Sequence, residues 1–217
     1  YQTGLVPLLL REAHRHEPRY ASIGTLFSIH NMGYQGIFPT DPEGDAQPVR
    51  DLIGVAPELS APTGPLEFWG RLNFMKAALH YADLINTVSE RYAEEIQTTD
   101  EFGFGLEGVL RDRRADVFGI LNGIDPEIWD PATDSLLPFN YTTKDLTGKK
   151  ANKIRLLETM ELPVEPEVPL IGVISRLVDQ KGFDLFAQIA GDLFGAKVKM
   201  VVLGNGQPKY EELVREL

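Results

Sequence analysis

Two cations, Arg176 and Lys181, stand five residues apart between a predicted strand and a predicted helix. The strand is the apolar run 170–174, which is rich in β-branched residues and typical of a strand buried on both faces of a sheet. The helix begins at Phe183, from which apolar residues recur at i, i+3, i+4 and i+7. Anions bind where parallel strands end and helices begin, so the two cations predict a phosphate site. There they would neutralise a diphosphate leaving group as its bond breaks.

The residues alone leave one alternative open, in which Arg176 and Lys181 form surface ion pairs with Asp179 and Asp184. The distribution of charge permits the phosphate site. Residues 171–217 hold six acidic and six basic side chains, so the whole net charge of −11 lies in residues 1–170. A nucleic acid would require clustered Lys and Arg, so this acidic chain is not expected to bind one.

Polar side chains also follow two other predicted strands. His30 stands at the carboxyl end of the predicted strand 22–29, and Asn122 at the end of the predicted strand 117–121. The aromatic loop 32–38, interrupted by glycines, can bring backbone close to a ligand. From the residues alone, His30 is either an ordinary loop histidine or a ligand contact. Polar residues on two separate sets of strand ends predict two nucleotide-type α/β domains that face each other.

Periodicity and helix breakers predict the remaining elements. Pro18 ends the first helix, and Ser89 is placed to N-cap another. The proline-rich stretch 39–67 is expected to be a long loop, either a binding segment or disordered, and 125–141 a segment between two domains. Helices are expected over 5–15, 67–82, 90–97, 106–113, 149–160, 183–193 and 209–217, and further strands over 83–88 and 198–203. The lysines expected to form a solvated helix face are Lys149, Lys150 and Lys153.

Several kinds of site are excluded by composition. The chain has no cysteine, which rules out disulfides and thiolate metal sites. His14 and His16 have no third ligand nearby and are expected to be solvated, so no metal site is predicted. No apolar run approaches the ~20 residues that a membrane span requires, so no membrane contact is expected.

Three segments carry motifs in a defined order. They are Phe-Ser-Ile-His-Asn-Met-Gly-Tyr-Gln-Gly-Ile-Phe-Pro at 27–39, Leu-Asn-Gly-Ile-Asp-Pro-Glu-Ile-Trp-Asp-Pro at 121–131 and Ser-Arg-Leu-Val-Asp-Gln-Lys-Gly at 175–182. They resemble the His-Asn-x-x-Tyr-Gln-Gly, Asn-Gly-(Val/Ile)-Asp-x-x-x-Trp-x-Pro and Ser-Arg-Leu-x-x-Gln-Lys-Gly motifs of bacterial glycogen synthases and plant starch synthases. The helix over 73–82 and the motif at 82–89 also fit, so the resemblance covers the chain from Gln2 onward.

The resemblance implies the GT-B architecture, an α/β fold of two facing Rossmann-like domains with parallel sheets. Residues 1–120 would belong to the N-terminal, acceptor-side domain, and 121–217 would begin the C-terminal nucleotide-sugar domain. Members of this family transfer glucose from ADP-glucose to the non-reducing end of an α-1,4-glucan, glycogen or starch, and retain the anomeric configuration. The resemblance implies no cofactor and no metal, because the two cations replace magnesium. It also favours the cytoplasm of a bacterium as the location.

The same motifs imply roles for individual residues. Arg176 and Lys181 would hold the donor diphosphate and stabilise the departing ADP. His30 would lie beside the transferred glucose, and Asn122 near the donor sugar and phosphates. The further substrate-binding residues implied by the family are Ser175, Tyr34, Gln35, Gly204 and Gly206, and the two glycines would let backbone approach the nucleotide.

Other motifs of the family do not occur in this chain. A Lys-x-Gly-Gly-Leu donor loop and a His-Asp pair would precede Tyr1, and a Glu-x₇-Glu motif would follow Leu217. We therefore expect these 217 residues alone to transfer little or no glucose. The alternatives are a sucrose or trehalose-phosphate type synthase of the same architecture, or a non-catalytic glucan- or nucleotide-binding fragment. The segment 30–36 favours the glucan synthases over the other synthases.

Overall fold

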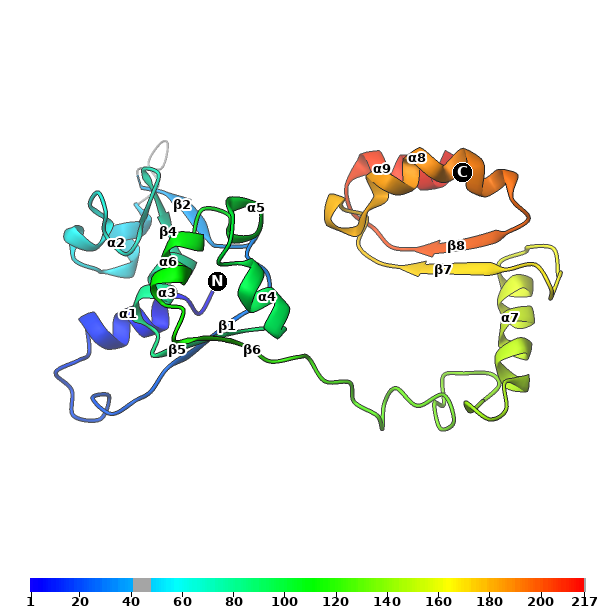
Figure 1. Cartoon of the computed structure of the whole chain (residues 1–217), viewed down its shortest axis with the longest axis horizontal. Helices are drawn as coiled ribbons and strands as arrows, with labels where there is room; N and C mark the ends of the chain where they lie inside the picture. The colour runs from blue at the N-terminus through cyan, green and yellow to red at the C-terminus, as the bar shows by residue number, and fades with distance from the viewer. Residues whose placement is uncertain (41–47, 217) are drawn as a thin grey trace. The chain divides into compact units, whose positions relative to one another are not determined.

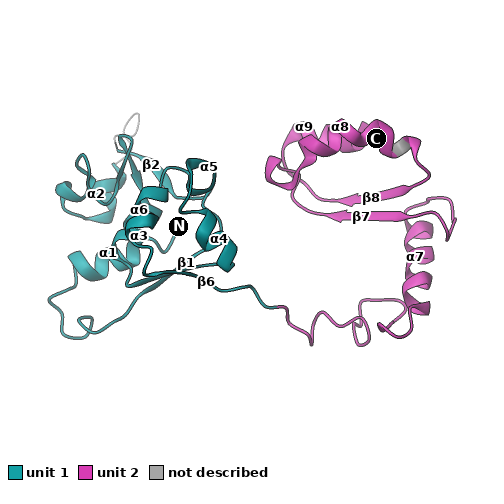
Figure 2. Ribbon diagram, in the orientation of Figure 1, with its two compact units in different colours: residues 1–123 teal, residues 124–217 magenta. Residues whose placement is uncertain are grey.

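The computed structural model describes residues 1–40 and 48–216, apart from the side chain of Phe194. The chain divides into two compact units, which are residues 1–123 (unit 1) and 124–217 (unit 2) (Figure 2). The division lies three residues beyond the expected boundary at 120/121. Each unit is α/β and contains a parallel sheet, as expected from the sequence.

Unit 1 is built on a three-stranded parallel sheet in the order β1-β5-β6 (Figure 1). Its strands are β1 (Leu26–Ile29), β5 (Leu84–Thr87) and β6 (Val117–Gly119). A second, antiparallel sheet has the order β2-β4-β3 and consists of β2 (Ile37–Pro39), β4 (Arg71–Asn73) and β3 (Glu67–Phe68). The helices are α1 (Leu5–Glu12), α2 (Val49–Ile53), a 3₁₀ turn (Pro57–Ser60), α3 (Phe74–Tyr81), α4 (Glu90–Glu95), α5 (Asp100–Gly103) and α6 (Glu107–Asp112).

The core of unit 1 lies between the parallel sheet and its helices. Alternate residues of β1 are buried, as the two-residue period of a strand requires. One apolar cluster joins the sheet to α3 and α6, and includes Phe27, Ile29, Met32, Met75, Leu79, Ile85, Ile96, Leu106 and Leu110. Burial of these side chains is the main stabilising contribution to the unit.

The region 67–82 differs from the single helix expected there. It contains the hairpin β3–β4 followed by α3, which begins only at Phe74. The side chain of Asn73 caps α3 by accepting a hydrogen bond from the backbone N–H of Lys76 (3.0 Å). The preceding stretch 39–67 also holds α2, the 3₁₀ turn and part of β3, so the prediction of a wholly irregular loop was wrong. Residues 41–47 of that stretch lie outside the described part. Short apolar runs fit a strand as well as a helix, which explains the misassignment.

Three other elements of unit 1 are shorter than predicted. Helix α1 ends at Glu12, well before Pro18, and β1 begins at Leu26. Strand β6 ends at Gly119, so Asn122 does not directly follow it. The predicted cap at Ser89 is confirmed, because its side chain accepts a hydrogen bond from the N–H of Tyr92 (3.0 Å).

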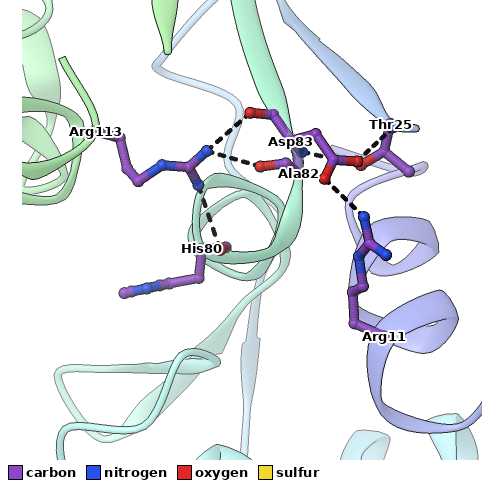
Figure 3. A network of polar contacts seen from close by, with 6 residues as sticks. All are labelled: Arg11, Thr25, His80, Ala82, Asp83 and Arg113. Carbon is purple, nitrogen blue, oxygen red and sulfur yellow. Dashed lines mark hydrogen bonds and ion pairs between the residues drawn. The ribbon is translucent and has the colours of Figure 1, made fainter. Parts of the chain in front are cut away.

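A polar network fastens the amino ends of β1 and β5 (Figure 3). The carboxylate of Asp83 accepts hydrogen bonds from the N–H and hydroxyl of Thr25 (2.7 and 2.8 Å) and pairs with Arg11 of α1 (2.6 Å). The guanidinium of Arg113 donates to the carbonyls of Ala82 (2.8 Å) and of the last turn of α3. These bonds satisfy carbonyls that a helix end leaves without partners.

Unit 2 contains the predicted βαβ unit, which is confirmed. Its elements are α7 (Thr147–Thr159), β7 (Leu170–Ile174), a 3₁₀ turn (Asp179–Lys181), α8 (Phe183–Gly195), β8 (Lys199–Leu203) and α9 (Pro208–Glu216). Strands β7 and β8 are parallel, and α8 and α9 pack on one face through a cluster that includes Leu177, Phe183 and Tyr210. The segment 124–146 holds no helix or strand, in agreement with the expected connecting segment.

Two expectations for unit 2 were wrong. Strand β7 is not buried on both faces, since Ile174 is 84% exposed. The sheet has two strands in the described part of the chain, and α8 and α9 cover the other face. Lys153 is not part of a solvated face: its ammonium donates to the carbonyls of Pro166 (2.5 Å) and Val168 (2.6 Å).

Candidate active site

Residues 175–182, called here the Arg176–Lys181 turn, continue from the carboxyl end of β7. Their backbone stays paired with the chain that leaves β8: Ser175 N–H donates to the carbonyl of Leu203 (3.1 Å), and Leu177 N–H to that of Asn205 (2.8 Å). A parallel bridge between Leu177 and Gly206 extends the sheet further. The turn is therefore held at the edge where open α/β sheets bind ligands.

Glycines 204 and 206 make this pairing possible. A Cβ atom on Gly204 would lie 1.9 Å from the carbonyl oxygen of Ser175, and one on Gly206 would lie 2.2 Å from that of Leu177. Any side chain at either position would collide with backbone. The two glycines are thus required by a close approach between two parts of this chain, and their approach to a nucleotide stays a prediction.

Asp179 anchors the middle of the Arg176–Lys181 turn to α9. Its carboxylate accepts hydrogen bonds from the ammonium of Lys209 (2.8 Å), the hydroxyl of Tyr210 (2.6 Å) and the amide of Gln207 (2.9 Å). The hydrogen bond from Lys209, followed by those from Tyr210 and Gln207, holds the pKa of Asp179 well below its usual value. Asp179 is thus engaged by three donors from Gln207 and from the start of α9.

Arg176 and Lys181 themselves lie on the exposed side of the turn. Lys181 precedes Gly182, whose positive φ of 73° ends the 3₁₀ turn and leads into α8. The hydroxyl of Ser175 donates to the carbonyl of Arg176 (3.2 Å). Two cations, a helix start and a strand end therefore come together on one hydrogen-bonded turn, an arrangement that suits a phosphorylated ligand.

In unit 1, His30 follows β1 directly and is exposed. Its backbone is positioned from both sides. The buried hydroxyl of Thr87, on the neighbouring strand, donates to the carbonyl of Ile29 (2.8 Å). Beyond His30, the N–H of Met32 donates to the hydroxyl of Tyr92 on α4 (3.1 Å).

Gln35, expected to contact substrate, is instead a structural residue of the same loop. Its side chain is 4% exposed, and both ends of its amide are bonded within the protein. The oxygen accepts from the amide of Asn73 (2.6 Å), and the nitrogen donates to the carbonyl of Phe104 (3.1 Å). Tyr34, its neighbour, is 48% exposed and remains accessible to a ligand.

Asn122 is also exposed, three residues after the end of β6. Because β1, β5 and β6 are parallel, His30 and Asn122 both follow the carboxyl edge of the same sheet. The predicted residues therefore form two sets. Unit 1 carries His30, Tyr34 and Asn122, and unit 2 carries Ser175, Arg176 and Lys181 with their supporting glycines.

The residues that hold these sets in place were not predicted from the sequence. They are Thr87, Tyr92, Asn73 and Asp179. Asn73 could have been found, since Asn is a favoured residue just before a helix. The bonds made by Thr87, Tyr92 and Asp179 join segments distant in sequence, and no local pattern signals them.

Histidines 14 and 16 are exposed, as expected, and the Nδ1 atom of His14 lies 2.7 Å from a carboxylate oxygen of Glu17. Over residues 1–40 and 48–216, no three His, Cys, Asp or Glu side chains are grouped as metal ligands would be. No helix in that part of the chain is long and apolar enough to cross a membrane.

Comparison with known proteins points to the same family as the sequence motifs. The family model described as the starch synthase catalytic domain matches residues 1–112. Glycogen synthase of Desulforudis audaxviator is 44% identical over the whole chain, and that of Moorella thermoacetica is 46% identical over 98% of it. The catalytic domain of starch synthase IV from Arabidopsis thaliana, bound to ADP and acarbose, has a TM-score of 0.84 at 31% identity and covers 99% of this chain.

The α/β fold, its parallel sheets and this structural likeness define a chain of GT-B glycosyltransferase architecture. The chain belongs to the starch synthase catalytic domain family, which confirms the resemblance stated from its motifs. It spans 41% and 42% of the length of the two glycogen synthases and 43% of the starch synthase structure.

Proposed function

We propose that the protein containing this chain is a glycogen or starch synthase, which transfers glucose from ADP-glucose to the non-reducing end of an α-1,4-glucan. The bond between C1 of glucose and the diphosphate oxygen breaks, and C1 bonds to the terminal 4-hydroxyl oxygen of the glucan. The hydroxyl proton is released, and ADP departs with the electron pair. The configuration at C1 is retained.

One observation carries this proposal: the Arg176–Lys181 turn stands at the carboxyl edge of β7 and β8, in a chain similar over 99% of its length to a starch synthase bound to ADP and acarbose. Negative charge grows on the diphosphate as its bond to glucose breaks. Two cations on a turn that Asp179 and the glycines hold rigid would stabilise that charge without reorganising.

His30, Tyr34 and Asn122 would contact the transferred glucose and the donor from unit 1. We propose that no metal ion takes part, because Arg176 and Lys181 supply the positive charge that magnesium provides elsewhere. The glycogen synthases compared above are bacterial proteins, and we propose the bacterial cytoplasm as the place of action.

The test is incorporation of labelled glucose from ADP-glucose into glycogen by the full-length protein, with UDP-glucose as the competing donor. Arg176→Ala and Lys181→Ala should each lower kcat by about 100-fold or more, as loss of a donor to developing charge does. EDTA should leave the rate unchanged.

Two exposed cations of the same unit serve as matched controls. Arg155 pairs only loosely with Glu158 (3.6 Å) and Lys197 with Glu165 (3.8 Å), and their alanine variants should keep the wild-type rate. A loss below threefold for Arg176→Ala would remove that residue from the mechanism. Failure of the wild-type protein to transfer glucose from either donor would overturn the function.

A further inference from the structure

Unit 1 contains a pocket of about 470 Å³ that the proposed catalytic residues do not use. Its size lies within the roughly 300–1,000 Å³ of small-ligand sites. The pocket lies between the β3–β4 hairpin, α3 and the junction of α5 with α6. Among its lining residues are Thr63, Phe68, Trp69, Lys76, Gly105 and Glu107, and it is called here the Trp69 pocket.

Trp69 is placed where folding alone would not favour it. It and Gly70 form the two-residue turn of the β3–β4 hairpin, with φ of 54° and 76°. Hairpin turns with two positive φ angles strongly prefer Asn-Gly or Asp-Gly, and a bulky residue there costs about 1 kcal/mol or more. The indole is 85% exposed, so burial does not offset that strain. A ligand that covers the ring would account for a tryptophan at this position.

The hairpin that carries Trp69 is held in place by its neighbours. Gly105, with φ of 81°, lies so close to the hairpin that a Cβ atom there would be 2.9 Å from the ring of Phe68. The ammonium of Lys76 donates to the carbonyls of Gly64 (3.0 Å) and Glu67 (2.6 Å), which ties the loop and hairpin to α3. These contacts therefore fix the loop and the hairpin that form the walls of the pocket.

The polar groups of the pocket suit an uncharged ligand rich in hydroxyls. The Oε2 atom of Glu107 is buried and has no hydrogen-bond partner among the described residues. That oxygen is covered by the protein near Gly103, so a ligand does not reach it directly. The side chains of Glu67 and Glu107 nevertheless line the pocket, and carboxylates accept hydrogen bonds from hydroxyl groups. Two carboxylates, Glu67 and Glu107, line the pocket beside the single ammonium of Lys76, so its charge does not favour an anion.

We propose that the Trp69 pocket binds a segment of an α-1,4-linked glucan chain. One face of a glucose ring carries C–H groups, which pack on the negative π face of the indole. The hydroxyls at the ring edge donate to the carboxylates of Glu67 and Glu107 that line the pocket. This inference rests on the proposed function, because it names a place where the acceptor substrate is held.

The pocket is also connected to the loop that carries His30. The amide of Gln35 donates to the carbonyl of Phe104 (3.1 Å), next to Gly105 in the pocket wall. Asn73, which ends β4 of the same hairpin, bonds the other end of that amide (2.6 Å). A glucan held by Trp69 would therefore be bound to the unit that presents His30.

The chain offers a direct reporter, since Trp69 and Trp129 are its two tryptophans. In the Trp129→Phe variant of these 217 residues, Trp69 is the only tryptophan that emits. Maltoheptaose should shift and saturate that emission, whereas cellohexaose, with β-1,4 links, should not. In Trp69→Asn, which places the residue preferred by this turn, the remaining Trp129 should not respond.

Affinity and stability separate a binding role from a structural one. By calorimetry, Trp69→Asn should bind maltoheptaose about tenfold more weakly while its Tm stays the same or rises. Glu107→Gln, which keeps the shape of the side chain, should weaken binding severalfold and serves if Trp69→Asn folds poorly. In full-length enzyme, both should raise KM for glucan and leave kcat unchanged.

The proposal is overturned if the emission of Trp69 does not change when maltoheptaose is added, or if both variants bind maltoheptaose with the affinity of the wild type. Equal responses to maltoheptaose and cellohexaose would also overturn it. The proposed function fails separately. Wild-type protein that transfers no glucose but still shows the Trp69 response would lack the synthase activity and keep the glucan site.

Discussion

At the Arg176–Lys181 turn, the residues that carry charge differ from those that set the geometry. Arg176 and Lys181 are exposed, and the turn is shaped by Asp179, Gly204 and Gly206. Exposed cations on flexible stems lose side-chain entropy when they bind a ligand. Because the supporting residues already fix the backbone beneath the two cations, ligand binding should cost side-chain entropy but little backbone entropy.

The Gly204→Ala variant adds a single carbon atom and tests whether Gly204 sets the geometry of the turn. The added Cβ would lie 1.9 Å from the carbonyl of Ser175, so the strand ends must separate. We expect unit 2 to lose about 1–3 kcal/mol, measured by urea unfolding followed by circular dichroism. Gly191→Ala is the control: it is in α8 with nothing within 4 Å, and should gain about 0.5–1 kcal/mol. Equal effects of the two substitutions would contradict the packing argument.

At the scale of elements, the two edges of the parallel sheet of unit 1 differ, since polar bonds fasten one edge and the other carries candidate site residues. The amino ends of β1 and β5 are joined by Asp83 and by Arg113, which also caps α3. The carboxyl edge carries His30 and Asn122, both exposed. Because polar bonds at the amino edge hold these strands together, the side chains of His30 and Asn122 at the carboxyl edge are not needed for that purpose.

Asp83→Ala should lower the free energy of unfolding of unit 1 by about 1–2 kcal/mol at pH 7, a modest value because the side chain is 44% exposed. Hydrogen bonds from Thr25, and then Arg11, hold the pKa of Asp83 below its usual value. Its stabilising contribution is therefore complete above about pH 4 and is lost as the pH falls through the folded-state pKa.

The measurement is urea unfolding of wild type and Asp83→Ala from pH 7 to pH 2. The gap between the two should narrow as the solution becomes more acidic. Asp112→Ala, an exposed change on α6, should stay within about 0.5 kcal/mol of wild type. A gap that widens toward acid would mean that Asp83 is not stabilising as a carboxylate.

At the scale of the whole molecule, the chain consists of two units with separate apolar clusters. The segment 124–146 between β6 and α7 has no helix or strand, and it exposes large apolar side chains such as Leu136 (89%) and Trp129 (74%). Each unit supplies a different set of candidate site residues. The proposed reaction therefore needs both units.

Limited digestion with chymotrypsin should cut first within 124–146, at Trp129, Leu136 or Phe139. These side chains are exposed and their backbone is in no helix or strand, the state that proteases select. Mass spectrometry should find two fragments that correspond to units 1 and 2. An initial cut inside the parallel sheet of unit 1, for example at Phe27, would contradict the division.

Much of the fold could be predicted because its signals are local. The βαβ unit of β7, α8 and β8 follows from the apolar period of its residues, and Ser89 was identified as a cap from its place before a helix. The chemistry available to Arg176 and Lys181 likewise depends on residue type and spacing. Their roles toward a donor stay predictions until the proposed variants are assayed.

The tertiary structure decided the features that depend on contacts between segments distant in sequence. Gly204 and Gly206 are required by the backbone of 175–177, and Asp179 is bonded by Lys209 and Tyr210 of α9. Gln35 is buried between Asn73 and Phe104, and Trp69 is strained and exposed in a hairpin that the sequence predicts as helix. Local sequence carries charge, period and caps, whereas burial, close approach and the pairing of buried polar groups exist only once distant segments pack together.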